Sequence, residues 1–359
     1  MPILPGMTKR DGPPRHRRAT LLAAAALAVL PAASLVACGP GESLPIAAGG
    51  AGTTPGTGTG TGGAPTDGGT PSPGTALPVG RSTRTISVGG VQRTVHAYRP
   101  AGLTGPAPLV VMLHGGYGGG TQAEDSYHWD QAADRGRFVA LFPDGTDKSW
   151  NAGGGCCGPA ARTGVDDVAF LKEAVATVRR QTGIDPDRVY VSGVSNGGAM
   201  AYRMACETDL FAAVGVDSTT MLVDCAGAAP ASVLHIHGAA DPVIRYDGAP
   251  GEPYSPRSPA IDGPPVPDAN AAWRRIDRCA PPRTTTSGVL TTSTATCPEG
   301  RDVELVTIAG AGHQWPGATP NPLAERLGAG TPSTALDATE TIWRFFADHP
   351  RPRAATPPA

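Results

Sequence analysis

Uninterrupted apolar runs recur along the chain from residue 81 onwards and alternate with segments in which apolar residues follow a helical spacing. Residues 109–113 form the first such run, which is typical of a strand buried on both faces of a sheet. Before it, residues 85–88 and 91–98 flank Gly89-Gly90 and predict a hairpin. Further strands are predicted at residues 138–142, 189–191, 212–216, 233–236 and 303–308.

Helices are predicted between these strands. Residues 165–180 carry apolar side chains at positions 165, 168, 171, 175 and 178, the spacing of one helix face. Other helical segments are expected at residues 198–207, 270–279 and 335–346. Alternating strands and helices indicate an α/β fold with a mostly parallel central sheet and helices on both faces. We expect one domain over residues 81–349, followed by a disordered tail over residues 350–359.

The N-terminal part of the chain has a different character. Basic residues at positions 9, 10, 15, 17 and 18 precede an apolar stretch over residues 19–37, which predicts an export signal peptide over residues 1–37. The stretch ends in Leu35-Val36-Ala37-Cys38, which resembles the lipobox of bacterial lipoproteins. We therefore expect a cell-envelope protein that a lipid on Cys38 anchors to a membrane. The alternative is a secreted protein that is cleaved nearby and keeps Cys38 as a spare thiol.

Residues 39–80 contain 14 Gly, 8 Thr and 7 Pro and only two charged side chains. Such a segment buries too little apolar surface to offset its ordering entropy, so residues 38–80 are predicted to form a lipidated, flexible tether. The whole chain has a formal net charge of −2, which argues against a nucleic-acid partner. Its one long apolar run is N-terminal, which argues against a polytopic membrane protein.

Six cysteines besides Cys38 lie in the part of the chain that is predicted to be exported. An even number of cysteines in an exported chain indicates disulfides. Fifteen pairings of six cysteines are possible. Short loops favour Cys206–Cys225 and Cys279–Cys297, which leaves Cys156–Cys157. A zinc site is the competing interpretation, but no Cys-x-x-Cys pair supports it, and we expect no metal.

The segment Gly193-Val194-Ser195-Asn196-Gly197 matches the pattern G-x-S-x-G. A predicted strand precedes it and a predicted helix follows it, which is the setting in which a sharp turn exposes a serine nucleophile. A glycine-rich phosphate loop or a plain turn is the alternative. We predict that Ser195 is a nucleophile.

A serine nucleophile needs a base and an acid, which in this setting follow along the chain in the order serine, acid, histidine. Asp241 and His313 fit this order, and each follows a predicted strand through a short loop. Because the carboxyl ends of parallel strands meet at one edge of a sheet, we expect both side chains near Ser195. The alternative acids are Asp217 and Asp247, and the alternative bases are His235 and His237.

Acyl transfer also needs two backbone N–H groups directed at the oxygen that becomes negative. Asn196 follows the nucleophile, and its backbone N–H is expected to be one donor. The loop after residues 109–113 reads His114-Gly115-Gly116-Tyr117 and predicts the other donor at Gly116, with Tyr117 as the alternative. His114 is expected to have a structural role.

These motifs belong to a longer ordered set that spans roughly residues 84–347. It also includes Ser149-Trp150-Asn151, residues 165–171, residues 185–190 and residues 312–317. The set resembles the secreted poly(3-hydroxybutyrate) depolymerase/feruloyl esterase family of α/β-hydrolases. The resemblance implies the α/β-hydrolase fold, the triad of Ser195, Asp241 and His313, and oxyanion donors at Gly116 and Asn196. It also implies that Trp315 lines the substrate pocket, with simple core packing as the alternative.

We therefore expect an extracytoplasmic serine carboxylesterase that needs no cofactor. Its substrate is expected to be a small or oligomeric ester with a short-chain, hydroxyacyl or feruloyl-type acyl group. Tyr117, Trp150, Trp315 and Tyr246 are aromatic residues that could build the substrate cleft. The sequence ends 13 residues after Phe346 without an added polymer-binding domain, which favours soluble esters over insoluble polyester. A serine peptidase on the same fold and a non-catalytic surface lipoprotein remain alternatives, and the sequence predicts no oligomeric state.

Overall fold

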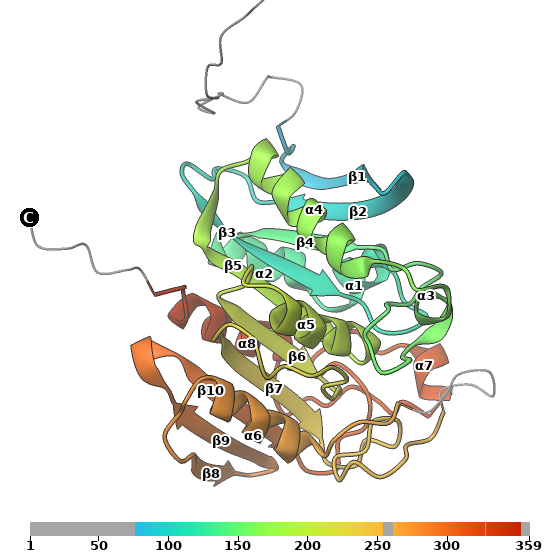
Figure 1. Cartoon of the computed structure of the whole chain (residues 1–359), viewed down its shortest axis with the longest axis vertical. Helices are drawn as coiled ribbons and strands as arrows, with labels where there is room; N and C mark the ends of the chain where they lie inside the picture. Colours follow the sequence, from blue (N-terminus) through green and yellow to red (C-terminus); the bar gives the residue numbers. More distant parts are fainter. Residues whose placement is uncertain (1–75, 254–260, 327, 353–359) are drawn as a thin grey trace, which may run out of the picture. The chain divides into compact units, whose positions relative to one another are not determined.

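The computed structural model describes residues 76–253, 261–326 and 328–352 (Figure 1). They lie in the second of two compact units, Asp67–Ala359. The first unit, Met1–Thr66, falls outside the described residues, and so do the predicted signal peptide and Cys38. The predicted tether is described only from residue 76, and the predicted tail only up to residue 352.

The strands of the described residues form one sheet. They are β1 (Gly80–Val88), β2 (Val91–Arg99), β3 (Ala107–Leu113), β4 (Val139–Pro143), β5 (Ile184–Val194), β6 (Ala213–Asp217), β7 (Ser232–Gly238), β8 (Arg283–Ser287), β9 (Leu290–Thr296) and β10 (Asp302–Ile308). Their order across the sheet is β1-β2-β4-β3-β5-β6-β7-β10-β9-β8. The pairs from β4 to β10 are parallel, and the flanking strands β1, β2, β8 and β9 pair antiparallel. The predicted sheet is therefore confirmed as mostly parallel.

Helices cover both faces of this sheet, as predicted (Figure 1). One face carries α4 (Asp167–Gln181), α5 (Asn196–Glu207) and α6 (Val266–Ile276), and the other carries α1 (Gly120–Ser126), α2 (Trp129–Gly136) and α8 (Ala338–Asp348). The short helices are α3 (Gly158–Thr163), α7 (Pro322–Arg326) and a 3-10 turn at Pro298–Gly300. Among the described residues, no helix is both long and apolar enough to cross a membrane.

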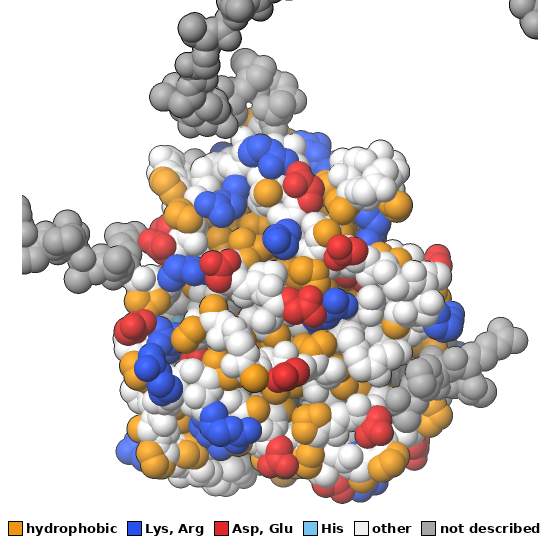
Figure 2. Space-filling view, in the orientation of Figure 1, with side chains coloured by type: hydrophobic (Ala, Val, Ile, Leu, Met, Phe, Trp, Pro, Cys, Tyr) orange, Lys and Arg blue, Asp and Glu red, His pale blue; other side chains and the backbone are white. Residues whose placement is uncertain are grey.

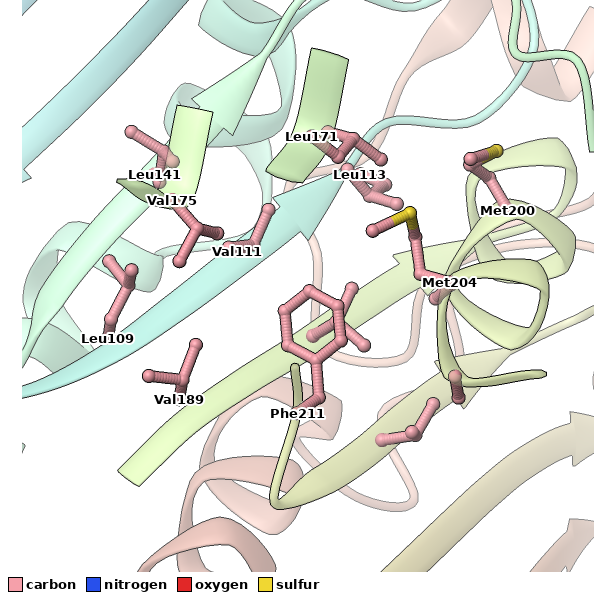
Figure 3. Packing of buried hydrophobic residues seen from close by; sticks show 14 of the residues in the cluster. Leu109, Val111, Leu113, Leu141, Leu171, Val175, Val189, Met200, Met204 and Phe211 are labelled. Atoms are coloured by element: carbon pink, nitrogen blue, oxygen red, sulfur yellow. The ribbon is translucent and has the colours of Figure 1, made fainter. Parts of the chain in front are cut away.

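Two apolar cores hold these layers together. In the core under α4 and α5, Leu109 and Val111 of β3 pack with Val175 and Met204 of the two helices (Figure 3). Alternate residues of the same strand, such as Val110, point into the second core, because successive side chains of a strand face opposite sides. The continuous apolar run over 109–113 is thus the consequence of two covered faces. On the outer face seen in Figure 2, acidic and basic side chains are interspersed.

Three disulfides are present in the described residues, with the pairing that the short loops favoured. Cys206 near the end of α5 is bonded to Cys225, and Cys279 after α6 is bonded to Cys297 after β9. The neighbouring residues Cys156 and Cys157 form the third bridge. Disulfides persist in oxidising compartments, so these bridges fit an extracellular protein.

Candidate active site

Ser195 lies at the sharp turn between β5 and α5. Its backbone has φ of 55° and ψ of −125°, a conformation that is strained for a residue with a side chain. Neighbouring glycines make the turn possible, because a Cβ on Gly193 would collide with the backbone of Gly197 and one on Gly197 with that of Leu113. The Ser195 N–H donates to the carbonyl of Asp217 at 3.0 Å. These contacts fix the turn at the carboxyl end of the sheet.

The structure brings Ser195, His313 and Asp241 together in one hydrogen-bonded series. The Ser195 Oγ lies 2.9 Å from Nε2 of His313, and Nδ1 of His313 lies 2.7 Å from Oδ2 of Asp241. Because the Asp241 carboxylate only accepts, Nδ1 of His313 carries the proton between them, and Nε2 is left to accept the proton of the serine hydroxyl. The three residues follow β5, β10 and β7 respectively, so they meet at one edge of the sheet as expected.

Backbone groups hold the second oxygen of the Asp241 carboxylate. Its Oδ1 accepts hydrogen bonds from the N–H groups of Val243 at 2.8 Å and Ile244 at 2.9 Å. Burial disfavours the charged form, but the charge of His313 and its hydrogen bond outweigh burial and lower the pKa of Asp241. The carboxylate is therefore ionised at neutral pH.

The alternative acids and bases do not join this series. Asp217 at the end of β6 is buried and, among the described residues, makes no hydrogen bond to a histidine; burial raises its pKa well above the usual range. Asp247 is exposed and paired with Arg245 at 2.7 Å. His235 and His237 are fully buried in β7, behind Asp241.

Two backbone N–H groups face the same cavity as Ser195. Within the described part of the chain, the N–H groups of Gly116 and Asn196 have no protein acceptor, and both residues line the cavity. The N–H of Tyr117, the alternative donor, is bonded to the carbonyl of Lys148 at 2.8 Å. Gly116 and Asn196 therefore each offer a backbone N–H of the kind that the oxyanion prediction requires.

His114 holds the loop that carries Gly116. Its Nδ1 lies 2.8 Å from the carbonyl of Gly115, which can only accept, so Nδ1 carries the proton. Its Nε2 accepts a hydrogen bond from the N–H of Gly145 at 2.9 Å. Burial lowers the pKa of His114, in keeping with this neutral form. The expected structural role fits these contacts.

Trp150 does not line the cavity, contrary to the prediction that it contacts substrate. Its side chain is fully buried, and its indole N–H donates to the carbonyl of His114 at 2.9 Å. The side chain of Asn196 binds the backbone of Trp150 twice: Oδ1 accepts from the Trp150 N–H at 2.7 Å, and Nδ2 donates to its carbonyl at 2.9 Å. Trp150 instead connects the loop of Gly116 with the start of α5, the two segments that carry the N–H donors.

A cavity of about 200 Å³ opens beside Ser195 and His313. Trp315 lines it and also packs in the core, with its ring 5.2 Å from that of Tyr127 and its indole N–H bonded to Thr339. Trp315 therefore both lines this cavity and packs in the core. Tyr117 is 54% exposed at the cavity, where it takes a left-handed backbone conformation. Tyr246 is not among the lining residues, and its hydroxyl pairs with Thr307 at 3.0 Å.

Sequence reasoning missed several residues of this cavity. Tyr127 follows the short helix α1, Val243 follows the Asp241 turn, and Cys157 contributes part of the wall. No local motif marks Tyr127 or Val243, because their positions depend on how distant loops fold back over the sheet. The described residues contain one cluster of metal-ligating type, Asp277, Cys279 and Cys297, but both cysteines are oxidised in a disulfide and offer no thiolate.

Comparison with known proteins finds esterases. Residues 95–264 match the family described as Esterase PHB depolymerase. Feruloyl esterase B of Piromyces equi is 30% identical over 233 residues, which are 60% of this chain and 41% of that protein. The bifunctional acetylxylan esterase/xylanase XynS20E of Neocallimastix patriciarum is 28% identical over 166 residues, 45% of this chain and 23% of that protein. The chain thus spans less than half the length of these two relatives.

A solved structure shows the same fold. Acetyl xylan esterase from Aspergillus awamori matches with a TM-score of 0.52 at 14% identity, over 74% of this chain and 99% of that one. The α/β-hydrolase fold predicted from the motifs is therefore confirmed.

Proposed function

We propose that the chain is a serine carboxylesterase that acts outside the cytosol, and the match of residues 95–264 to the Esterase PHB depolymerase family supports this proposal. The observation that carries the proposal is the series Ser195–His313–Asp241 beside two backbone N–H donors in one cavity. A nucleophile, a base, an orienting acid and an oxyanion site are the parts that acyl transfer needs.

The first half of the reaction forms an acyl-enzyme. Nε2 of His313 accepts the proton of Ser195 as Oγ attacks the ester carbonyl carbon. The N–H groups of Gly116 and Asn196 stabilise the oxygen that takes the electron pair. When the carbonyl re-forms, the bond to the alcohol breaks, and the alcohol leaves with the proton held by His313. Asp241 stabilises the imidazolium while it exists.

The second half releases the acid. His313 accepts a proton from water, which attacks the acyl carbonyl and forms the same kind of oxyanion. Collapse of this intermediate breaks the bond to Ser195 Oγ, which recovers its proton from His313. Neither half requires a metal or cofactor in the scheme we propose.

We propose that the substrate is a soluble ester with a short-chain, hydroxyacyl or feruloyl-type acyl group. The cavity of about 200 Å³ is smaller than the roughly 300–1,000 Å³ of sites that bury a drug-sized ligand. Tyr117, Tyr127 and Trp315 line it and offer aromatic surfaces to a hydroxyacyl or phenyl group. Rates should fall from butyryl to dodecanoyl p-nitrophenyl esters, and a steady rise would contradict this part of the proposal.

We further propose that a lipid on Cys38 anchors the domain to a membrane. The lipobox-like residues 35–38 and the Gly, Thr and Pro content of residues 39–80 support this proposal. Diacylation supplies the two hydrocarbon chains that stable attachment needs. Cys38→Ala should release the protein from the membrane fraction of its host, whereas an unmodified, soluble wild type would overturn the proposal.

Steady-state hydrolysis of p-nitrophenyl butyrate tests the esterase proposal, with the corresponding p-nitroanilide as the amide. The wild type should cleave the ester much faster than the amide, and Ser195→Ala should cleave neither. Ser126→Ala is the matched control, since Ser126 also lines the cavity but lies outside the series. Preferred cleavage of amides would favour a peptidase, and a wild type without turnover would favour a non-catalytic lipoprotein.

A further inference from the structure

Behind Asp241, two buried histidines and a tyrosine form a second hydrogen-bonded series that runs into the core. Nε2 of His237 lies 2.8 Å from the carbonyl of Ile244 and 3.5 Å from Oδ2 of Asp241. Nδ1 of His237 lies 3.2 Å from Nε2 of His235. Nδ1 of His235 in turn lies 3.0 Å from the hydroxyl of Tyr202. Nothing in the acyl-transfer steps uses these side chains.

The proton positions in this second series follow from the Ile244 carbonyl and from the burial of both rings. The Ile244 oxygen can only accept, so Nε2 of His237 carries a proton. Burial lowers the pKa of His237, and the ring is neutral, so its Nδ1 is an acceptor for the Nε2 proton of His235. Burial also holds the pKa of His235 well below its usual value, and a hydrogen bond to the Thr219 backbone only partly opposes this shift. The ring is therefore neutral, and its Nδ1 accepts from the hydroxyl of Tyr202. All donors therefore point toward the Asp241 end.

The fold places these groups side by side. His235 and His237 are two residues apart in β7, so their side chains lie on the same face of the sheet. That face is covered by α5, which carries Tyr202 and begins next to Ser195. The ring of Tyr202 lies 5.8 Å from that of His235, and both are fully buried.

His237 also closes the loop that presents Asp241. Its bond to the Ile244 carbonyl joins the end of β7 to the far side of the turn. The N–H of the same Ile244 and that of Val243 hold Oδ1 of Asp241. Nε2 of His237 also lies 3.5 Å from Oδ2, the oxygen that is hydrogen-bonded to His313. A shift of His237 would therefore be felt by both carboxylate oxygens.

We propose that His237 is a positioning residue for the acid Asp241, and that His235 and Tyr202 hold it in the tautomer that presents Nε2–H. The proposal rests on the esterase function proposed above and deepens it. His237 acts by holding the carboxylate in the plane and distance that His313 requires. A role in packing alone would be met equally well by an apolar side chain, since every residue of β7 is buried.

Kinetics of two His237 variants test the proposal. His237→Leu removes the N–H donor, and His237→Gln keeps an N–H near the place of Nε2. His349→Leu is the matched control, because Nδ1 of His349 also bonds a backbone carbonyl and its Nε2 also faces an aspartate, Asp302 at 3.2 Å. His349 lies at the end of α8 and outside the cavity.

With p-nitrophenyl butyrate, His237→Leu should lower kcat by about 10–100-fold, the range for leaving a buried acceptor, here the Ile244 carbonyl, without its donor, and leave KM within about threefold. His237→Gln should recover most of this loss. Tyr202→Phe should lower kcat by less than about tenfold, since it removes only the outermost donor. His349→Leu should lower stability and leave kcat unchanged. Wild-type kcat in His237→Leu, or a His237→Gln variant as impaired as His237→Leu, would overturn the proposal.

A spectroscopic measurement keeps the proposal testable apart from turnover. The proton between His313 and Asp241 should give a strongly deshielded imidazole resonance in the wild type. His237→Leu should shift or broaden this resonance, and His349→Leu should leave it in place. An unchanged resonance in folded His237→Leu would overturn the positioning role, while absence of ester hydrolysis by the wild type would overturn only the esterase function. If His237→Leu does not fold, His237→Gln and Tyr202→Phe supply the same comparison.

Discussion

Replacing Asn196 by alanine perturbs the site without touching the proposed triad. The Asn196 side chain is buried and makes two hydrogen bonds to the backbone of Trp150. After Asn196→Ala, the Trp150 N–H loses its acceptor inside the protein. The Trp150 carbonyl keeps one donor, the N–H of Cys157 at 3.1 Å. The loss of the acceptor for the Trp150 N–H therefore costs more stability than the loss of one of the two donors to its carbonyl.

The expected loss of stability follows from this difference. A buried donor left without a partner costs about 1–3 kcal/mol, and a hydrogen bond whose acceptor keeps another donor contributes about 0.5–1.5 kcal/mol. Asn196→Ala should thus lower the free energy of unfolding by about 1.5–4.5 kcal/mol, a large share of the roughly 5–15 kcal/mol of a typical domain. The backbone N–H of residue 196 remains, but it is held less firmly. We expect kcat to fall by about tenfold, less than the roughly 10²–10³-fold cost of removing an oxyanion donor.

Urea unfolding followed by circular dichroism and hydrolysis of p-nitrophenyl butyrate measure the two effects. Asn270→Ala is the matched control, because Asn270 is also buried and donates to the carbonyl of Glu304 at 3.0 Å, on α6 and away from the cavity. It should lower stability and leave kcat unchanged. Wild-type stability of Asn196→Ala would refute the bracing contact, and a destabilised variant with wild-type kcat would refute its link to the oxyanion site.

Three other changes have expected outcomes that follow from single contacts. Asp241→Asn should lower kcat about 10⁴-fold, the effect seen in a serine protease triad. Asp217→Asn should leave kcat nearly unchanged, because burial raises the pKa of Asp217 well above its usual value and so favours the uncharged form, which Asn resembles; equal losses in the two variants would contradict the assignment of the acid. Replacing Cys206 and Cys225 by alanine should cost about 3 kcal/mol in urea unfolding, the value for a bridge between residues 19 apart, and unchanged stability would refute this bridge. Burial raises the pKa of Asp277 to about 7, so the native state keeps a proton that the unfolded chain releases near pH 4. The free energy of unfolding should therefore decline as the pH rises from about 4 to about 7. Asp277→Asn should remove that contribution, and an unaltered pH dependence of unfolding would count against it.

The sequence predicted those parts of the fold in which a single short segment carries a strong pattern of apolar residues. β3 and the strands beside it are apolar on both faces, so the run over 109–113 could be recognised without knowing its neighbours. The hairpin β8–β9 was missed because all five residues of β8 are exposed and its sequence, Arg-Thr-Thr-Thr-Ser, has no apolar alternation. Helices α1 and α2 were also missed. Each is at most eight residues long and so offers little periodicity to detect.

The candidate site likewise contains residues that a local motif reveals and residues that it does not. Ser195, Asp241 and His313 could be selected because each lies in a short motif after a strand, and the structure brings their side chains together. Trp150 was placed wrongly, because a sequence does not show to which side of a loop an indole turns. The contacts of His237 could not be foreseen either. They depend on the register of β7 against α5, which only the packed structure defines.

The most direct test of the central claim is the site at which a serine-reactive fluorophosphonate bonds to the protein. The phosphorus should form a bond to Oγ of Ser195 and release fluoride, and peptide mass spectrometry should find one label per chain on the peptide that contains residue 195. Esterase activity should disappear in proportion to labelling, and Ser195→Ala should take up no label and lose roughly 10⁶-fold in kcat, as in a serine protease. Labelling of another residue, or hydrolysis by Ser195→Ala at more than about a tenth of the wild-type rate, would contradict the account.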